Sequence, residues 1–289
     1  MKKKLIKYLI PSLTLAGGVA LIITGYVMGF SADYKEQLNT ADIQSVVKSD
    51  TIMSLDISTD FADVEIVASN DVENIEVKAT NISRDFLNYS TSNNIFALEY
   101  PVNKWYENIT VPMMSKNPGN ITITVPAELP LKDVEIQTGG CTSTVKYLSA
   151  DNIYIDGGRG DVVIDTIEAK YTELNGGFGN VGATNITTEK FTLSGGSGNI
   201  TLTNLVTDKG EFDTGSGDVQ LSGIIEKDSS FVCGSGDVTA KIFRHISNYS
   251  VYTGDDEILL NGKEFTGMTK GENHMDITTG FGDVSITFE

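Results

Sequence analysis

The sequence is poor in cysteine, with only Cys141 and Cys233 among its 289 residues. If the chain is a stack of 19-residue units, the two lie about five units apart, which is roughly 24 Å at ~4.8 Å per unit. A disulfide requires Cα atoms within about 7 Å of each other. We therefore expect two buried, unpaired thiols and no intrachain disulfide.

Histidine is equally scarce. Neither His245 nor His274 has metal-ligand spacing to another histidine or cysteine, which disfavours a zinc site. The chain also lacks a G-x-S-x-G nucleophile motif. Its G-x-G phrases are not followed by a helix that could bind phosphate. The sequence thus indicates no catalytic residue and no cofactor.

Basic residues are few, 21 against 39 acidic ones, and the net charge is −18. Residues 1–30 hold four of the lysines and no acid, so the other 17 basic and 39 acidic residues give −22. This charge excludes a nucleic-acid partner, whose phosphates need a basic surface. It also argues against electrostatic docking onto anionic lipid.

Proline is absent after Pro130, whereas 24 of the 29 glycines follow it. In a parallel stack each strand bonds to neighbours on both edges, and a residue without an N–H would break a ladder. Glycine instead allows tight corners. This contrast favours a stack of strands over residues 131–289.

The N-terminus combines lysines at positions 2–4 and 7 with an uncharged apolar run from Tyr8 to Phe30. The run is long enough to cross a bilayer as a helix, and the lysines favour a cytoplasmic N-terminus. We therefore predict that residues 1–33 form a single transmembrane anchor and that the C-terminal part is extracytoplasmic. A cleaved signal peptide is the alternative.

The polar residues 34–50 are predicted to be a stalk. Alternating apolar and polar residues from Thr51 onward predict strands and no helix. Residues 51–130 are interpreted as an N-terminal β cap, interrupted by an irregular insertion, Ser83 to Asn120. Trp105 and Tyr106 lie in this insertion as candidate ligand-binding residues, because exposed aromatics in loops often anchor partners. The alternative is that Trp105 covers the end of the stack.

A phrase of the form G-x-G-[DN]-[VI] recurs every 19 residues between Ile155 and Val238. A strict period of this kind indicates stacked copies of one unit. The glycines before the acidic or amide residue are predicted to form the turns, and they are Gly160, Gly179, Gly198, Gly217 and Gly236. The predicted fold is all-β, a parallel β-solenoid of about 19 residues per coil with an irregular N-terminal β cap, preceded by one transmembrane helix.

Alignment by 19 residues also predicts the interior as four apolar columns. The first contains Ile136, Ile155, Leu174, Leu193, Phe212 and Phe231, and the second Val162, Val181, Ile200, Val219 and Val238. The third contains Ile164, Ala183, Leu202, Leu221 and Ala240, and the fourth Ile167, Ile186, Leu205, Ile224 and Phe243. Polar residues alternate with these positions, as expected for strands with one buried face.

The lead-in T-V-P-A-E-L-P-L-K-D-V-E-I, at 124–136, followed by repeated G-S-G-D-V, resembles a bacterial family of unknown function labelled “putative adhesin”. The resemblance covers roughly residues 50–289. It implies an extracytoplasmic parallel β-solenoid built of β-strand repeats, often held by one N-terminal membrane helix. It implies no catalytic residues.

The acidic corner residues Asp161, Asp218, Asp237, Asp256 and Asp283 admit two interpretations. Each could cap the backbone of its own turn, which explains why Asn180 and Asn199 occupy the same position. Alternatively, Asp161, Asp218 and Asp237 could bind calcium, although 19 is the wrong period for the known calcium repeat.

Two functions remain open. The first is a non-enzymatic, membrane-anchored protein that binds an envelope polymer or a protein partner, as an adhesin or in the sensing of envelope stress. The alternative is a polysaccharide-active enzyme, which would need two carboxylates held about 5–10 Å apart in a cleft. Asp255, Asp256 and Glu257 are adjacent acids, but such a run is more typical of a solvent-exposed turn than of a catalytic pair.

Overall fold

The computed structural model describes residues 40–101, 119–254 and 256–289, and hydrogen bonds join their 21 strands into one continuous sheet. The strands of the N-terminal part are β1 (Thr40–Val47), β2 (Ser54–Thr59), β3 (Ala62–Ser69), β4 (Ile75–Ser83), β5 (Asn88–Ser92), β6 (Ile95–Tyr100), β7 (Gly119–Pro126) and β8 (Leu131–Thr138). Those of the repeats are β9 (Ser143–Asp156), β10 (Val162–Ile164), β11 (Ile167–Gly177), β12 (Val181–Gly195), β13 (Ile200–Thr214), β14 (Val219–Ile225), β15 (Ser229–Cys233) and β16 (Val238–Ile242). The C-terminal elements are the 3₁₀ turn η2 (Ile246–Asn248), β17 (Tyr249–Tyr252), β18 (Ile258–Leu260), β19 (Lys263–Phe265), β20 (Asn273–Thr279) and β21 (Val284–Phe288).

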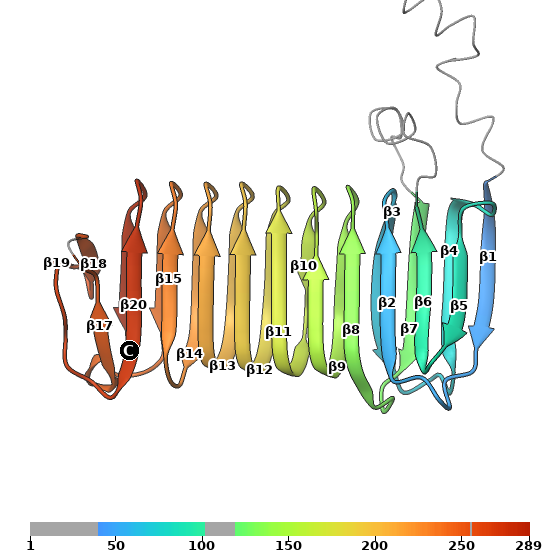
Figure 1. The fold of residues 1–289 in the computed structure, drawn as a ribbon, viewed down its shortest axis with the longest axis horizontal. Coiled ribbons are helices and arrows are strands. Elements are labelled where there is room, and N and C mark those ends of the chain that lie inside the picture. Colours follow the sequence, from blue (N-terminus) through green and yellow to red (C-terminus); the bar gives the residue numbers. More distant parts are fainter. Residues whose placement is uncertain (1–39, 102–118, 255) are drawn as a thin grey trace, which may run out of the picture. The chain divides into compact units, whose positions relative to one another are not determined.

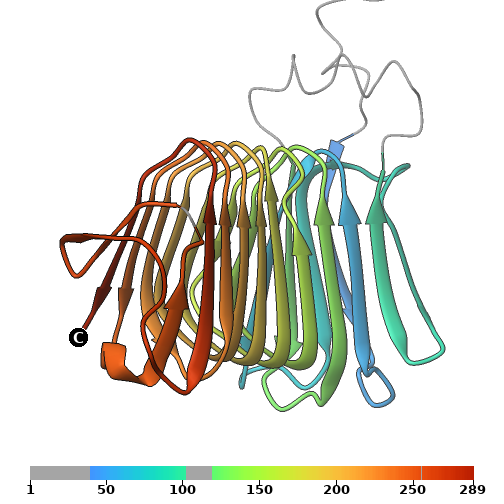
Figure 2. The same cartoon turned by 60° about the vertical axis from the view of Figure 1, so that its left-hand side comes forward.

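The predicted 19-residue coil is confirmed by the register of the central strands. Along β12 and β13, Val181 pairs with Ile200, Ile186 with Leu205, and so on in parallel. The coils therefore stack in register, and the equivalent strands of successive coils lie side by side along the stack (Figure 1). Viewed from the side, each coil closes around an interior (Figure 2).

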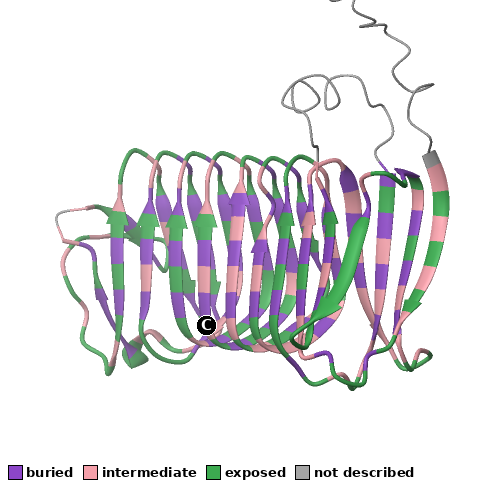
Figure 3. Ribbon diagram, turned by 45° about the vertical axis from the view of Figure 1, so that its right-hand side comes forward, coloured by how far each residue is buried: buried purple, intermediate pink, exposed green. Residues whose placement is uncertain are grey.

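Along most strands buried residues alternate with exposed or half-buried ones (Figure 3). The buried residues of successive coils face the interior and fill it. The first three predicted columns are buried throughout, with every member at most 3 % exposed. Phe212 and Phe231, in adjacent coils, stack with ring centroids 4.5 Å apart. Stacked rings of this kind add to the free energy gained by burying their area.

The fourth predicted column is correct only as far as Leu205. Leu205 pairs with Gly223 and not with Ile224, because the register slips by one residue between Leu202 and Leu205. Between these pairs β13 has two residues, Thr203 and Asn204, where β14 has only one, Ser222. Asn204 has a positive φ of 58°. As a result Ile225 is buried, whereas Ile224 and Phe243 are only half-buried.

The corners require glycine because the backbones of neighbouring coils approach each other closely there. A Cβ atom added to Gly198 would lie 1.8 Å from the carbonyl oxygen of Gly179. The other predicted turn glycines are equally crowded, with the added Cβ 1.9–2.1 Å from the backbone oxygen of the preceding coil. A side chain at these positions would push the coils apart, so the five glycines are structural.

At the N-terminal end, the order of strands along the stack departs from the order in the sequence. β2 lies between β6 and β8, and β3 lies between β7 and β9, all in parallel. Beyond them the sheet ends in antiparallel pairs, in which β5 pairs with β6, β4 with β7, and β1 with β4. β1 covers residues 40–47, so the second half of the predicted stalk (34–50) is part of the sheet.

The C-terminal end is also non-sequential. β20 pairs with β15 on one side and with β17 on the other, and β21 lies between β16 and β18. The last coil in the sequence is therefore inserted between two earlier ones. β18 then pairs antiparallel with the short β19 at the end of its row. Irregular ends of this kind hinder edge-to-edge association.

The structure does not support the predicted transmembrane helix, because the part of the chain that it describes is all-β. Among residues 40–101, 119–254 and 256–289, no helix is long and apolar enough to cross a membrane. The predicted anchor, residues 1–33, lies outside the described residues. The single-pass membrane localisation and the membrane as a partner, which both depended on that helix, have no support in the structure and are not retained.

Candidate functional site

The outer end of each glycine corner carries one exposed side chain, and these form a row along the stack. We call this the tip row, and its members are Arg159, Phe178, Ser197, Ser216, Ser235 and Phe281. The backbone N–H of each tip residue donates to the carbonyl of a glycine in the preceding coil, at 2.8–3.1 Å. The row is thus held by a continuous ladder of hydrogen bonds.

Two phenylalanines stand out in this row. Phe281 is 95 % exposed and Phe178 71 % exposed. The Arg159 guanidinium lies over the Phe178 ring, 6.0 Å from its centroid. Serine occupies the same position in the three coils between them, so the corner itself does not require an aromatic side chain. The G-F-G phrases at 177–179 and 280–282 were the signal in the sequence, but exposure could not be inferred from them.

Beside the tip row lies a second row, the Asx ladder, which consists of Asp161, Asn180, Asn199, Asp218, Asp237 and Asp283. Each Oδ1 accepts a hydrogen bond from the backbone N–H of the next member, at 2.8–3.0 Å. The sequence-based expectation that each side chain caps its own turn is therefore wrong. The acceptor serves the next coil, and because aspartate and asparagine both carry this oxygen, either can occupy the position.

Asp256 is not a member of the ladder. Its Oδ2 accepts from the backbone N–H of Thr279, and Asp283 follows Asp237 directly, because the last coil is inserted there. Among the described residues, no group of three His, Cys, Asp or Glu side chains could hold a metal ion. The calcium alternative for Asp161, Asp218 and Asp237 thus gains no support from the geometry.

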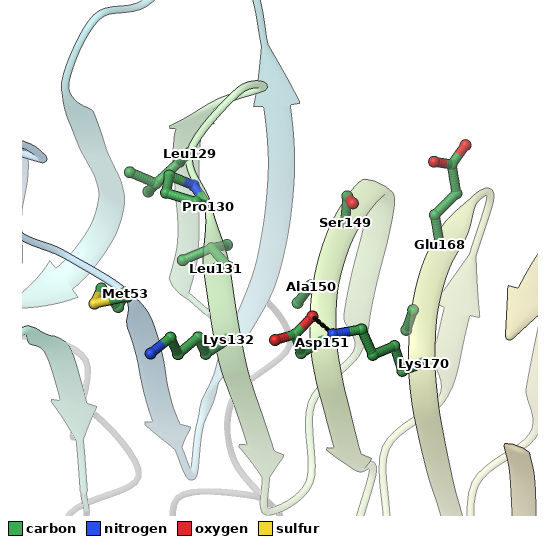
Figure 4. A pocket seen from close by; sticks show the side chains of 11 residues that line it. Met53, Leu129, Pro130, Leu131, Lys132, Ser149, Ala150, Asp151, Glu168 and Lys170 are labelled. Atoms are coloured by element: carbon green, nitrogen blue, oxygen red, sulfur yellow. Dashed lines mark ion pairs between the residues drawn. The ribbon is translucent and has the colours of Figure 1, made fainter. Parts of the chain in front are cut away.

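A hollow of ≈ 440 Å³ opens on another side of the coils, between β8, β9 and β11. Its lining is partly apolar, from Met53, Leu129, Leu131, Ala150 and Ala169. Leu131, Ala150 and Ala169 are paired across neighbouring strands, so the two small alanines leave space next to the leucine. Figure 4 shows Leu131 and Ala150 on neighbouring strands.

The charged side chains around the hollow do not form a catalytic pair. Asp151 is bound to Lys170 at 2.7 Å, and both side chains are largely in solvent. Glu168 points away from Asp151 (Figure 4). The usual mechanism of glycoside hydrolysis requires two carboxylates that face one glycosidic bond. The hollow does not provide this geometry, so it gives the predicted enzymatic alternative no site.

Both cysteines are free thiols, and Cys233 is buried. Burial, together with the nearby Asp63 and Asp60 carboxylates, raises the pKa of Cys141 to about 12. Burial also raises the pKa of Cys233 to about 11. Since the thiolate is the reactive form, neither thiol is prepared for nucleophilic catalysis at neutral pH.

The other predicted ligand-binding residues, Trp105 and Tyr106, lie outside the described residues. The structure therefore brings together the five predicted turn glycines and the acidic corners Asp161, Asp218 and Asp237. It adds Phe178 and Phe281, which the sequence had not singled out. The candidate site is the tip row with the adjoining Asx ladder.

Comparisons with known proteins agree with this architecture. A crystal structure of a “putative adhesin” from Bacteroides fragilis NCTC 9343 has a TM-score of 0.54 and 14 % identity, and covers 86 % of this chain and 97 % of its own. A “putative lipid binding protein” from Parabacteroides distasonis ATCC 8503 has a TM-score of 0.45 and 19 % identity, covering 87 % and 98 %. A “putative adhesin” from the same strain has a TM-score of 0.28 and 10 % identity, also covering 87 % and 98 %.

At 14 % identity the first structure shows a shared fold alone. The TM-scores of the other two are below 0.5, so nothing about this chain is inferred from them. No curated protein matches the chain. The family model described as Toastrack DUF4097 matches residues 52–287, which include every coil of the repeat. The chain belongs to the Toastrack DUF4097 family.

Proposed function

We propose that the protein is a non-enzymatic binding protein that holds a macromolecular component of the bacterial envelope against its tip row. The observation that carries this proposal is the exposure of Phe178 and Phe281 at positions where the fold accepts serine. Exposing a phenylalanine to water has a cost that burial against a partner would recover. The adhesin name of the structural neighbour from Bacteroides fragilis is consistent with such a role.

The rigidity of the corner supports the same role. The tip residues are fixed by backbone hydrogen bonds to the preceding coil, and the flanking glycines leave no room for the coils to slide. A partner would therefore meet a surface that is already ordered, and little conformational entropy would be lost on binding. The hollow described above lies elsewhere, between β8, β9 and β11, so a partner must gain its affinity from several contacts along the row.

The experiment is co-sedimentation of the purified full-length chain with washed envelopes from the bacterium that encodes it. We expect Phe178→Ser and Phe281→Ser each to reduce the bound fraction, because each change gives the corner the side chain of its neighbours. The matched controls are Val163→Ser and Val232→Ser, which remove exposed apolar side chains from other parts of the coils. Binding that is absent, or equal in all four variants, would refute the proposal.

A further inference from the structure

We infer that the tip row binds an uncharged polysaccharide chain that lies along the stack and contacts both Phe178 and Phe281. This inference rests on the proposed function and adds the chemical class of the ligand. It follows from the spacing of the two rings, the small residues between them and the charge of the adjoining row.

The two rings occupy equivalent positions, separated by four steps of the backbone ladder, from Phe178 through Ser197, Ser216 and Ser235 to Phe281. At about 4.8 Å per coil, the distance along the stack is roughly 19 Å. One small molecule cannot touch both rings at this distance. An extended polymer can, and it would gain affinity from both contacts.

The side chains between the rings suit sugars. The three serines are exposed and short, so none obstructs a chain that passes from one ring to the other. Their hydroxyl groups both donate and accept hydrogen bonds, as sugar hydroxyls do. The aromatic rings offer flat, electron-rich faces, against which the C–H groups of a sugar ring can pack.

The charge of the neighbouring row disfavours anionic chains along its C-terminal part, beside Phe281. Asp218, Asp237 and Asp283 lie on successive coils of the stack, and none of the three has an ion-pair partner among the described residues. Asp218 and Asp237 use Oδ1 for the ladder, so the Oδ2 atom of each remains available as an acceptor for a hydroxyl. Phosphate, sulfate or uronate groups would be repelled here, whereas neutral sugars would not.

The test uses the same co-sedimentation assay with envelopes treated in two ways. Periodate cleaves the vicinal diols of sugars, and a protease removes accessible protein. We expect periodate to abolish binding and protease to leave it unchanged. We also expect binding to change by less than about twofold between 0.05 and 0.5 M NaCl, because an uncharged ligand is insensitive to screening.

The two phenylalanines should contribute jointly. Loss of one ring contact should weaken binding about tenfold, and loss of both about a hundredfold, if one chain contacts both rings. Binding that depends on Phe178 and Phe281 but is removed by protease and resists periodate would overturn the polysaccharide and leave the proposed function standing. Binding that resists periodate and falls steeply with salt would also overturn it. Binding that is independent of both phenylalanines would overturn the inference and the proposed function together.

Discussion

The Oδ1 atom of Asn199 lies 3.0 Å from the backbone nitrogen of Asp218, in the next coil, and accepts its hydrogen bond. The same bond repeats from Asp161 to Asp283 along the Asx ladder. It shows that the recurrent acidic or amide residue links coils and does not close its own turn. The ladder needs an acceptor at each step, and it does not need a charge.

Removing that acceptor should weaken the stack by a small, defined amount. Asn199→Ala should lower the free energy of unfolding by about 1 kcal/mol, the usual net value of one hydrogen bond. Asn199→Asp keeps the acceptor but places a carboxylate beside Asp218, so its loss should shrink when salt is added. Urea denaturation at 0.05 and 0.5 M NaCl measures both effects. Thr201→Ala, an exposed change in the same coil, is the control, and an Asn199→Ala loss no larger than this control would contradict the ladder's role.

Substitution by alanine should change the stability of the protein very differently at two glycines in adjacent coils. A Cβ on Gly198 would lie 1.8 Å from the Gly179 oxygen, whereas a Cβ on Gly182 would meet nothing within 4 Å. Gly198→Ala should therefore lose more than about 4 kcal/mol or fail to fold, because backbone must move. Gly182→Ala should stay within about 0.5 kcal/mol of the parent or be slightly more stable. Thermal unfolding and soluble yield decide between these outcomes, and equal stabilities would show that the coils can separate at little cost.

The inserted C-terminal coil should be protected from hydrogen exchange although it ends the chain. β20 and β21 are each bonded on both sides, to β15 and β16 and to β17 and β18. Their amides should exchange more slowly than those of β19, which pairs with β18 alone among the described strands. Hydrogen-exchange mass spectrometry can compare these segments, with β16 as the internal reference. If β20 and β21 exchange first, the last coil does not lie between the two others in solution.

Stability should fall as the pH becomes alkaline. Burial raises the pKa of Cys233 from the ordinary 9.0 to about 11. It also raises the pKa of Tyr249, whose hydroxyl donates to the Ile225 carbonyl, from 10.0 to about 12. A raised pKa in the folded state means that the stabilising contribution is complete below the unfolded pKa and is lost as the pH rises towards the folded pKa. The free energy of unfolding should therefore be flat from pH 7 to about 8.5 and decline above pH 9.

The matching variants are Cys233→Ala and the double change with Cys141→Ala. They should flatten the decline between pH 9 and pH 11, because the thiols no longer titrate. In the folded parent at pH 8, both thiols should react with iodoacetamide far more slowly than they do in urea. Rapid alkylation of the folded protein would show that the thiols are more accessible than the structure indicates.

Much of the repeat could be predicted from the sequence, because a constant period makes each residue the neighbour of its equivalent in the next coil. The columns through Phe212 and Val219, the crowded corner at Gly198 and the free thiols all followed from that relationship. The fourth column failed after Leu205, because a missing corner residue shifts the register without breaking the overall 19-residue count at the G-x-G phrases. A local slip of this kind is decided by packing.

The candidate site was less accessible to sequence reasoning. Phe178 and Phe281 fit the apolar content of any strand protein, and only the close stacking of their glycine neighbours places both rings in solvent on one row. The acidic corners do lie at turns, but their side chains accept hydrogen bonds from the next coil. That role depends on a distance between segments, which a pattern within one turn cannot supply.

The sequence by itself determined the solenoid, since its period, its glycine corners and its alternating strands all require stacked coils. Only the tertiary structure decided the order of those coils at the two ends, where β2 and β3, and later β20 and β21, insert between strands distant in the chain. The physical reason is that periodicity specifies the equivalent residue in an adjacent coil, whereas the choice of adjacent coil depends on long-range pairing. The same distinction separates the corner, which the repeat specifies, from the exposed tip row that the assembled coils present.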